Sequence, residues 1–129
     1  MINHVSMGSN DMSRAAAFYD TVLATLGYSR VFSDSAAMAW GLKWPEFWIM
    51  APYNGAAAQA GNGVHVAFIA DSREAVQRFH AAAIGAGGTD GGPPGERDYM
   101  PGYYAAYVRD PDGNKIEACY MPDVPFPGG

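Results

Sequence analysis

The sequence predicts an α+β protein built from two tandem βαβββ modules. The first observation is an internal repeat, because His4-Val5 and His65-Val66 each open a strand-like segment in similar halves of the chain. The spacing also agrees, since Phe18 and Phe79 follow their histidines at the same interval. A four-stranded sheet with one helix leaves one sheet face uncovered, so we expect the uncovered faces of the two modules to pair.

The first module is expected at residues 1–53. Residues 2–8 alternate as a half-buried strand does, and Asp11 is placed to cap the helix that follows. Gly27 ends that helix. Three short strands are expected near 28–32, 37–42 and 47–51, and residues 54–62, rich in Ala, Gly, Asn and Gln, are expected to be a linker.

The second module is expected at residues 63–121, within a single domain spanning 1–129. A strand at 64–69 precedes a helix whose start at 71–74 resembles a capping box, with Glu74 as its third residue. Glycines at 85–88 end the helix, and residues 91–95 are expected to be a turn-rich connector. Strands at 103–109 and 114–120 flank a strong turn signal at 110–113.

Composition excludes several functions. The chain has 129 residues and a formal net charge of −5 without a Lys/Arg cluster, so we expect no nucleic-acid or anionic-membrane partner. Cys119 is the only cysteine, which excludes an intrachain disulfide and a cysteine-based zinc site. No apolar run approaches the ~20 residues that span a bilayer. A cytoplasmic location is therefore expected.

Strand alternation brings together a group that can bind a metal ion. His4 and His65 point to the sheet faces opposite those of their apolar neighbours, and Glu117 points to the face opposite that of Ile116 on the last strand. Two imidazoles and one carboxylate are a ligand set for Fe, Mn, Ni, Co or Zn that leaves positions open for substrate. The competing interpretation is that each histidine is an ordinary polar strand residue.

The chain resembles the vicinal oxygen chelate superfamily, which includes glyoxalase I, extradiol dioxygenases and the fosfomycin- and bleomycin-resistance proteins. The resemblance covers nearly the whole chain and depends on residues 3–5, 18–28, 65–68 and 107–117. The segment 107–117 is the most specific of these. It implies that the modules form a curved, barrel-like mixed sheet around a central cleft. It also implies one divalent metal ion at His4, His65 and Glu117, and a homodimer that completes the cleft.

The resemblance implies an enzyme acting on a small molecule, either a glyoxalase-like lyase or isomerase or an extradiol-type dioxygenase. Glyoxalase I has a fourth metal ligand, a carboxylate, in the strand that matches residues 47–50. This chain has no carboxylate in that segment, and Glu46 is the nearest one. Alternatives are a metal-free protein that binds a drug or metabolite, and a fosfomycin-type thiol transferase. The expected catalytic residues are Glu117 and Tyr104, the latter if Arg109 pairs with Asn114. The expected substrate contacts are Ser6, Trp48, Tyr104 and Cys119.

Overall fold

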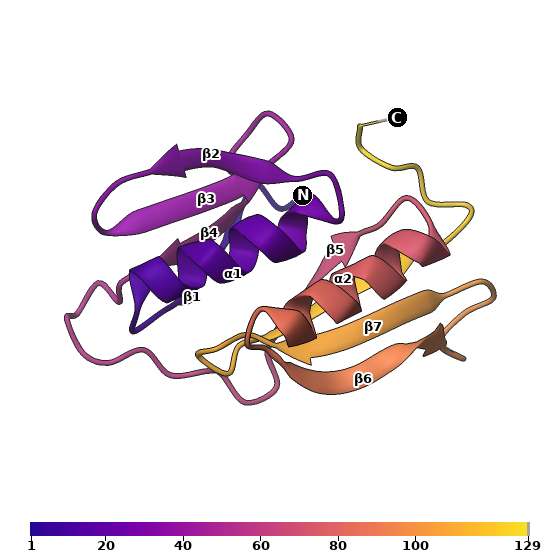
Figure 1. Cartoon of the computed structure of the whole chain (residues 1–129). Helices are drawn as coiled ribbons and strands as arrows, with labels where there is room; N and C mark the ends of the chain where they lie inside the picture. Colours follow the sequence, from indigo (N-terminus) through magenta and orange to yellow (C-terminus); the bar gives the residue numbers. More distant parts are fainter. Residues whose placement is uncertain (129) are drawn as a thin grey trace.

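The computed structural model describes residues 1–128 and contains the two expected βαβββ modules (Figure 1). The first module consists of β1 (Val5–Gly8), α1 (Met12–Ala24), β2 (Ser29–Ser33), β3 (Ala37–Gly41) and β4 (Phe47–Met50). The second consists of β5 (His65–Ile69), α2 (Arg73–Gly85), β6 (Thr89–Glu96), β7 (Tyr104–Arg109) and β8 (Lys115–Tyr120). The repeat predicted from the sequence is confirmed.

Each module forms its own four-stranded sheet. The strand orders are β1-β4-β3-β2 and β5-β8-β7-β6, with β1 parallel to β4, β5 parallel to β8, and the other pairs antiparallel. Within residues 1–128 the two sheets share no strand pairing, so they are not closed into the expected barrel. The modules instead meet through α1 and α2, which contact each other and lie in front of their sheets in Figure 1.

The helix ends largely follow the predicted signals. The Asp11 side chain accepts a hydrogen bond from the Arg14 N–H at 3.0 Å and caps α1. In α2 the cap is Ser72 rather than Asp71, so Glu74 is the second residue of the helix and not the third. Gly27 has a φ of 85°, which favours glycine after a helix.

The expectation of a connector at 91–95 is wrong, because these residues belong to β6. This strand pairs with β7 on one side only, and its pairing shifts between Asp90 and Gly92 and again between Gly92 and Gly95. An edge strand interrupted by bulges tolerates prolines, since their missing N–H groups are not needed for pairing. Pro93 and Pro94 lie between these irregularities.

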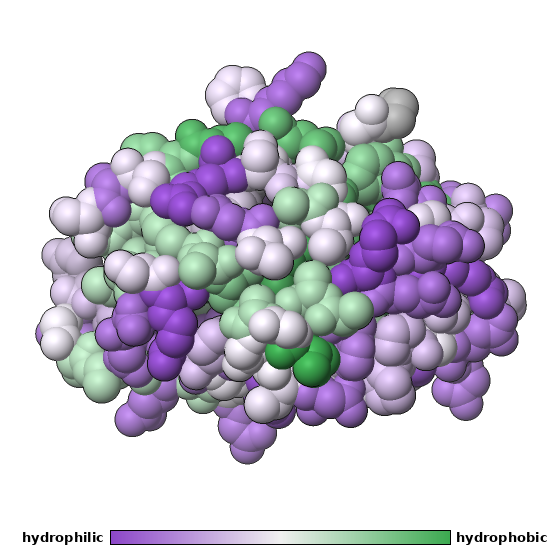
Figure 2. Space-filling model, viewed as in Figure 1, coloured by the Kyte–Doolittle hydropathy of each residue, from purple (hydrophilic) through white to green (hydrophobic). Residues whose placement is uncertain are grey.

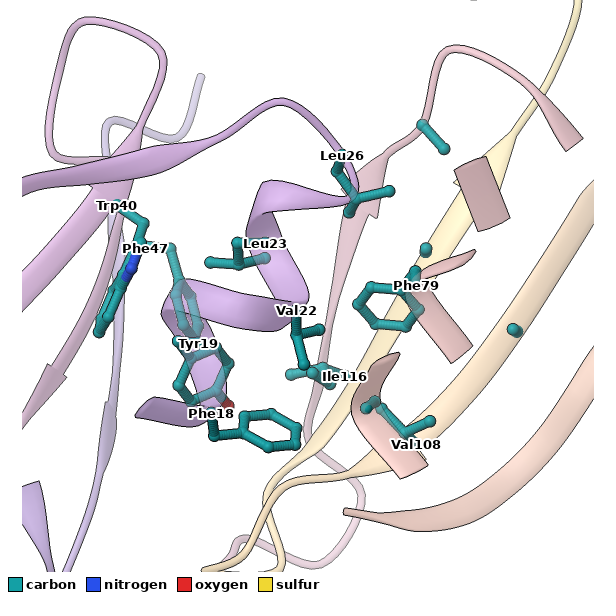
Figure 3. Packing of buried hydrophobic residues seen from close by; sticks show 14 of the residues in the cluster. Phe18, Tyr19, Val22, Leu23, Leu26, Trp40, Phe47, Phe79, Val108 and Ile116 are labelled. Atoms are coloured by element: carbon teal, nitrogen blue, oxygen red, sulfur yellow. The ribbon is translucent and has the colours of Figure 1, made fainter. Parts of the chain in front are cut away.

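A single hydrophobic core extends across both modules (Figure 3). Phe18, Val22 and Leu23 of α1 are almost completely buried, as is Phe79 of α2. The rings of Phe47 and Phe68 meet edge to face with their centroids 5.0 Å apart, although they come from different sheets. The two modules therefore bury their apolar surface together.

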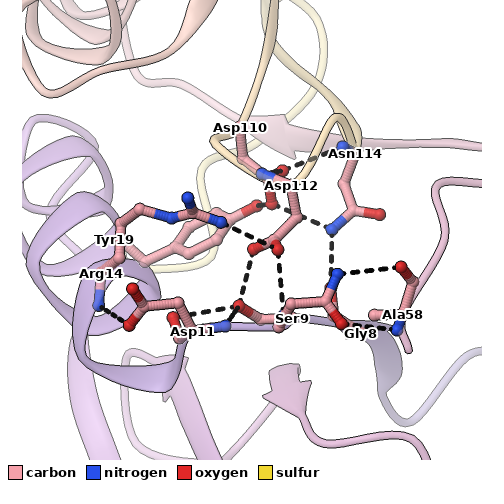
Figure 4. Close-up of polar contacts among 10 residues, drawn as sticks. Gly8, Ser9, Asp11, Arg14, Tyr19, Ala58, Asp110, Asp112 and Asn114 are labelled. Carbon is pink, nitrogen blue, oxygen red and sulfur yellow. Dashed lines mark hydrogen bonds and ion pairs between the residues drawn. The ribbon is translucent and has the colours of Figure 1, made fainter. Parts of the chain in front are cut away.

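A polar cluster also joins the modules at the turn between β7 and β8 (Figure 4). Buried Asp110 accepts hydrogen bonds from the Tyr19 hydroxyl at 2.6 Å and from the Asn114 backbone N–H at 2.9 Å. Asp112 accepts from the Ser9 hydroxyl at 2.6 Å and pairs with Arg14 at 3.1 Å. The predicted turn thus also ties the second module to the start of α1.

The surface matches this arrangement. Over both helices, hydrophilic side chains are interspersed with apolar ones (Figure 2), as expected for helices that bury one face. Among residues 1–128, neither helix combines the length and apolar character that crossing a membrane requires.

Candidate functional site

His65 and Glu117 form the centre of the candidate site. They lie on the paired parallel strands β5 and β8, and alternation turns both toward the sheet face that α2 leaves uncovered. His65 Nε2 is 2.9 Å from Glu117 Oε1. The Glu117 side chain is only 2% exposed, whereas that of His65 is 43% exposed. A buried carboxylate therefore meets an imidazole that solvent and ligands can reach.

The second oxygen of Glu117 is also engaged. The Tyr103 hydroxyl donates a hydrogen bond to Glu117 Oε2. Burial, together with this hydrogen bond to Glu117, raises the pKa of Tyr103 well above its usual value, so the hydroxyl keeps its proton. Cys119 lies on the same face of β8, and burial raises the pKa of its thiol. Cys119 is therefore a weak nucleophile in this environment.

A cavity of about 490 Å³ opens beside this group. His65, Tyr103 and Glu117 line it together with two cationic side chains, Arg97 and Lys115. Two further tyrosines also contribute to its wall, and their hydroxyls are 3.3 Å apart: Tyr99 and Tyr107. The cavity thus combines aromatic rings, hydroxyl donors, positive charge and one carboxylate.

Tyr104 does not lie in this site, which corrects the predicted register of the last hairpin. Arg109 pairs with Lys115 rather than Asn114, and Tyr107 lies opposite Glu117. Tyr104 therefore faces α2, where its hydroxyl accepts a hydrogen bond from Gln77 at 3.0 Å and Arg73 lies over its ring. Its neighbour Tyr103, directly before β7, is the tyrosine that contacts Glu117.

The remaining predicted residues belong to the first module: Ser6 and Trp48 lie in its sheet, whereas His4, expected in the first strand, directly precedes β1. Ser6 is opposite Trp48 on the face that α1 leaves uncovered. The His4 ring lies against Trp48, with centroids 6.3 Å apart, and its Nδ1 is 2.6 Å from Asn3 Oδ1. His4 and His65 both line a second cavity of about 440 Å³ between the modules.

The three expected metal ligands do not come together in this chain. Among residues 1–128, no group of three or more His, Cys, Asp or Glu side chains is arranged to hold a metal ion. The cause is the open arrangement of the two sheets, because their uncovered faces do not meet within one chain. Two of the three donors, His65 and Glu117, are in contact.

Sequence reasoning missed Arg97, Lys115, Tyr103 and Tyr107 as site residues. Strand alternation alone places Lys115 on the same face as Glu117, so the sequence was sufficient to predict Lys115 as a site residue. Tyr103 and Tyr107 needed the correct hairpin register, and Arg97 belongs to the loop after β6.

Comparison with known proteins agrees with the fold. A family model described as Glyoxalase/Bleomycin resistance protein/Dioxygenase superfamily matches residues 1–118. The chain belongs to this superfamily. No curated protein matches it.

Solved structures place the chain among other members of the superfamily. A glyoxalase/bleomycin resistance protein from Albidiferax ferrireducens T118 has 42% sequence identity and a TM-score of 0.86, and the match covers 95% of this chain and 99% of that one. A glyoxalase-related enzyme from Fulvimarina pelagi has 21% identity and a TM-score of 0.76, covering 98% and 91%. The fosfomycin resistance protein FosX from Listeria monocytogenes has 19% identity and a TM-score of 0.67, covering 93% and 92%. The last two show a shared fold.

Proposed function

We propose that the protein is a cytoplasmic small-molecule metalloenzyme that holds one divalent ion, Fe, Mn, Ni, Co or Zn, with His4, His65 and Glu117. The observation that carries this proposal is the 2.9 Å contact between His65 Nε2 and Glu117 Oε1 at the wall of a cavity of about 490 Å³. Imidazole nitrogen and carboxylate oxygen are suitable donors for all of these ions.

The residues around the pair fit a metal ligand. The Tyr103 hydroxyl holds one oxygen of Glu117, and such outer contacts orient ligating carboxylates. Burial of Glu117 keeps its carboxylate in one position. Two donors in contact, one of them fixed in this way, are consistent with a site that needs one more ligand.

We propose that a second copy of the chain supplies that ligand. His4 is exposed directly before β1, with its ring beside Trp48. A two-fold dimer that places these two residues over the cavity of its partner would give two equivalent sites, each with His4 from one chain and His65 and Glu117 from the other. Ser6 and Trp48 would then contact the substrate.

When bound, the ion would polarise a carbonyl, enolate or catecholate oxygen of the substrate. The chain's own residues prepare the site around it: the Tyr103 hydroxyl holds Glu117, and Tyr99 and Tyr107 present aromatic rings and hydroxyl oxygens to the cavity. Both a glyoxalase-like lyase or isomerase and an extradiol-type dioxygenase remain candidates. Turnover of the methylglyoxal–glutathione hemithioacetal would identify the first, and oxygen uptake with a catechol the second.

The separation of His4 from His65 and Glu117 in one chain favours one alternative function, metal-free binding of a drug or metabolite in the same cavity. A fosfomycin-type thiol transferase is a further alternative.

Mixing of two variants tests the metal site and the dimer together. We expect about one ion per chain in the wild type and none in His4→Ala or His65→Ala. Unfolding and refolding the two variants together at equal amounts should restore about one quarter of the wild-type metal content, because half of the dimers are mixed and each has one intact site. Gel filtration should give the mass of a dimer.

Each other outcome has a clear meaning. A wild-type protein that binds none of the five ions contradicts the metalloenzyme and favours the binding protein. Metal in the wild type, its loss in both variants and no recovery after mixing would place the three ligands in one chain and contradict the shared site. Refolded wild type treated in the same way is the control for recovery of the fold.

A further inference from the structure

The cavity beside Glu117 contains unbalanced positive charge. Arg97 and Lys115 both line it, and both are half-buried. Glu117 is the carboxylate in its wall, and His65 and Tyr103 already occupy its two oxygens. Of the five ion pairs among residues 1–128, none includes Arg97 or Lys115. Two of the eight Lys and Arg residues of an acidic chain thus line one cavity, and neither forms an ion pair with the carboxylate there.

The structure holds Arg97 in this position. Its Nη2 donates a hydrogen bond to the Pro93 carbonyl at 2.7 Å, and the guanidinium carbon lies 5.6 Å from the centre of the Tyr107 ring. Glycines in β6 make the necessary space, because a Cβ atom would lie 3.3 Å from Arg97 Nη2 at Gly92 and 3.1 Å from Nη1 at Gly95. The bulged, glycine-rich strand therefore lets Arg97 fold back across it into the cavity.

Lys115 reaches the same ring from β8. Its Nζ lies 5.0 Å from the centre of the Tyr107 ring. The aromatic ring attracts each cation but does not neutralise it. A planar guanidinium and a compact ammonium on one aromatic wall suit an anionic group, since the first can donate two parallel hydrogen bonds and the second acts as a point charge.

We propose that Arg97 and Lys115 form a subsite that binds an oxyanion of the substrate, a carboxylate or a phosphonate, beside His65 and Glu117. This inference deepens the proposed function, because it assigns the substrate of the same cavity to the anionic small molecules. The anionic group is held at Tyr107, and the reacting part of the substrate points toward Glu117.

Binding of three related probes tests the subsite. Phenylacetate and phenylphosphonate carry the two candidate oxyanions, and phenylacetamide is a neutral counterpart of the first. Calorimetric titration should use full-length protein passed over a chelating resin, so that no metal ion can bind the probes. We expect at least one anion to bind at least about tenfold more tightly than phenylacetamide, with a Kd that rises with salt. The better anion identifies the substrate class.

The variants Arg97→Gln and Lys115→Gln should each weaken binding of that anion about tenfold or more, without changing the Kd for phenylacetamide. Arg78→Gln is the matched control, because it removes one positive charge from an exposed position of α2 outside the cavity. Equal binding of anionic and neutral probes would overturn the proposal. So would an equal loss in Arg78→Gln, which would show that only net charge matters.

Metal content of the same variants separates this inference from the proposed function. Arg97→Gln and Lys115→Gln should retain the wild-type metal content. Anion binding that depends on both residues in a protein that never takes up metal would support the subsite and contradict the metalloenzyme. If the wild type binds metal and both variants bind the anion as tightly as the wild type does, the result would support the metalloenzyme and contradict the subsite.

Discussion

The contacts of Glu117 show how single side chains define the site. Its carboxylate is buried, and each oxygen has a different partner, His65 on one side and Tyr103 on the other. Hydrogen bonds to a buried charged group are among the stronger ones, and each contributes about 1.5–3 kcal/mol. Tyr103 therefore acts on the site through Glu117, as a positioning residue.

Two neighbouring tyrosines give a matched pair of substitutions. Tyr103→Phe should lower the free energy of unfolding by about 1.5–3 kcal/mol and weaken metal binding at least about tenfold, because Glu117 loses a donor. Tyr104→Phe removes a hydroxyl bonded to Gln77 on the opposite sheet face and should leave metal affinity unchanged. Urea unfolding and metal titration check both. Equal metal affinity in the two variants would contradict the role of Tyr103.

These two residues also show what the sequence can predict about a site. Strand alternation determines that Tyr103 and Tyr104 face opposite ways, and it placed His65 and Glu117 correctly on the uncovered face. Which tyrosine joins Glu117 depends on the hairpin register. Asn114 belongs to the turn, where its carbonyl accepts from the Asp110 N–H at 2.8 Å, so the strand pairing begins one residue later than expected. Such turn geometry is not contained in a hydrophobic pattern.

At the scale of elements, the repeated glycines have different roles. The repeat aligns Gly27 with Gly88, yet in the second module the residue with positive φ is Gly87, at 101°. Gly88 is needed for another reason, since a Cβ atom there would lie 2.8 Å from the Arg109 carbonyl oxygen and 3.0 Å from Phe18 Cε2. The sequence predicts where the helix ends, whereas this close approach depends on how β7 and Phe18 of α1 pack around Gly88.

Two alanine substitutions at the end of α2 should therefore have opposite effects. Gly88→Ala should lower the free energy of unfolding by about 1–3 kcal/mol through overlap with the neighbouring carbonyl groups. Gly85→Ala, at a helical position with open space around it, should raise it by up to about 0.5–1 kcal/mol. Thermal and urea unfolding of both variants measure the difference. Destabilisation of equal size in both would contradict this explanation.

At the scale of the whole molecule, the two modules are joined by the shared core and by the cluster around Asp110 and Asp112 (Figures 3 and 4). The βαβββ repeat was visible in the sequence because hydrophobic periodicity is local. The separation of the two sheets was not, because it depends on how α1 and α2 pack together. The position of His4 relative to Glu117 follows from that packing.

Removal of the buried carboxylate of Asp110 tests this coupling. Asp110→Ala leaves the Tyr19 hydroxyl and the Asn114 N–H without their acceptor, so the free energy of unfolding should fall by at least about 2 kcal/mol. All three tryptophans lie in the first module, so their fluorescence reports on that module alone. Its urea midpoint should nevertheless shift together with the circular dichroism signal.

The matched control is Asp98→Ala, an exposed carboxylate in the loop before β7, which should leave both signals unchanged. A tryptophan transition that stays in place while the circular dichroism transition moves would mean that the modules unfold independently.

The contacts of Ser9 and Tyr19 have a consequence for biosynthesis. Their partners, Asp112 and Asp110, belong to the turn between β7 and β8, so α1 leaves the ribosome long before these two residues have been synthesised. Until then, part of the apolar surface of the first module stays exposed to solvent. Stable folding of the two modules accordingly begins only after Asp110 and Asp112 have been synthesised, and slow translation of the second module lengthens the period during which the chain depends on chaperones.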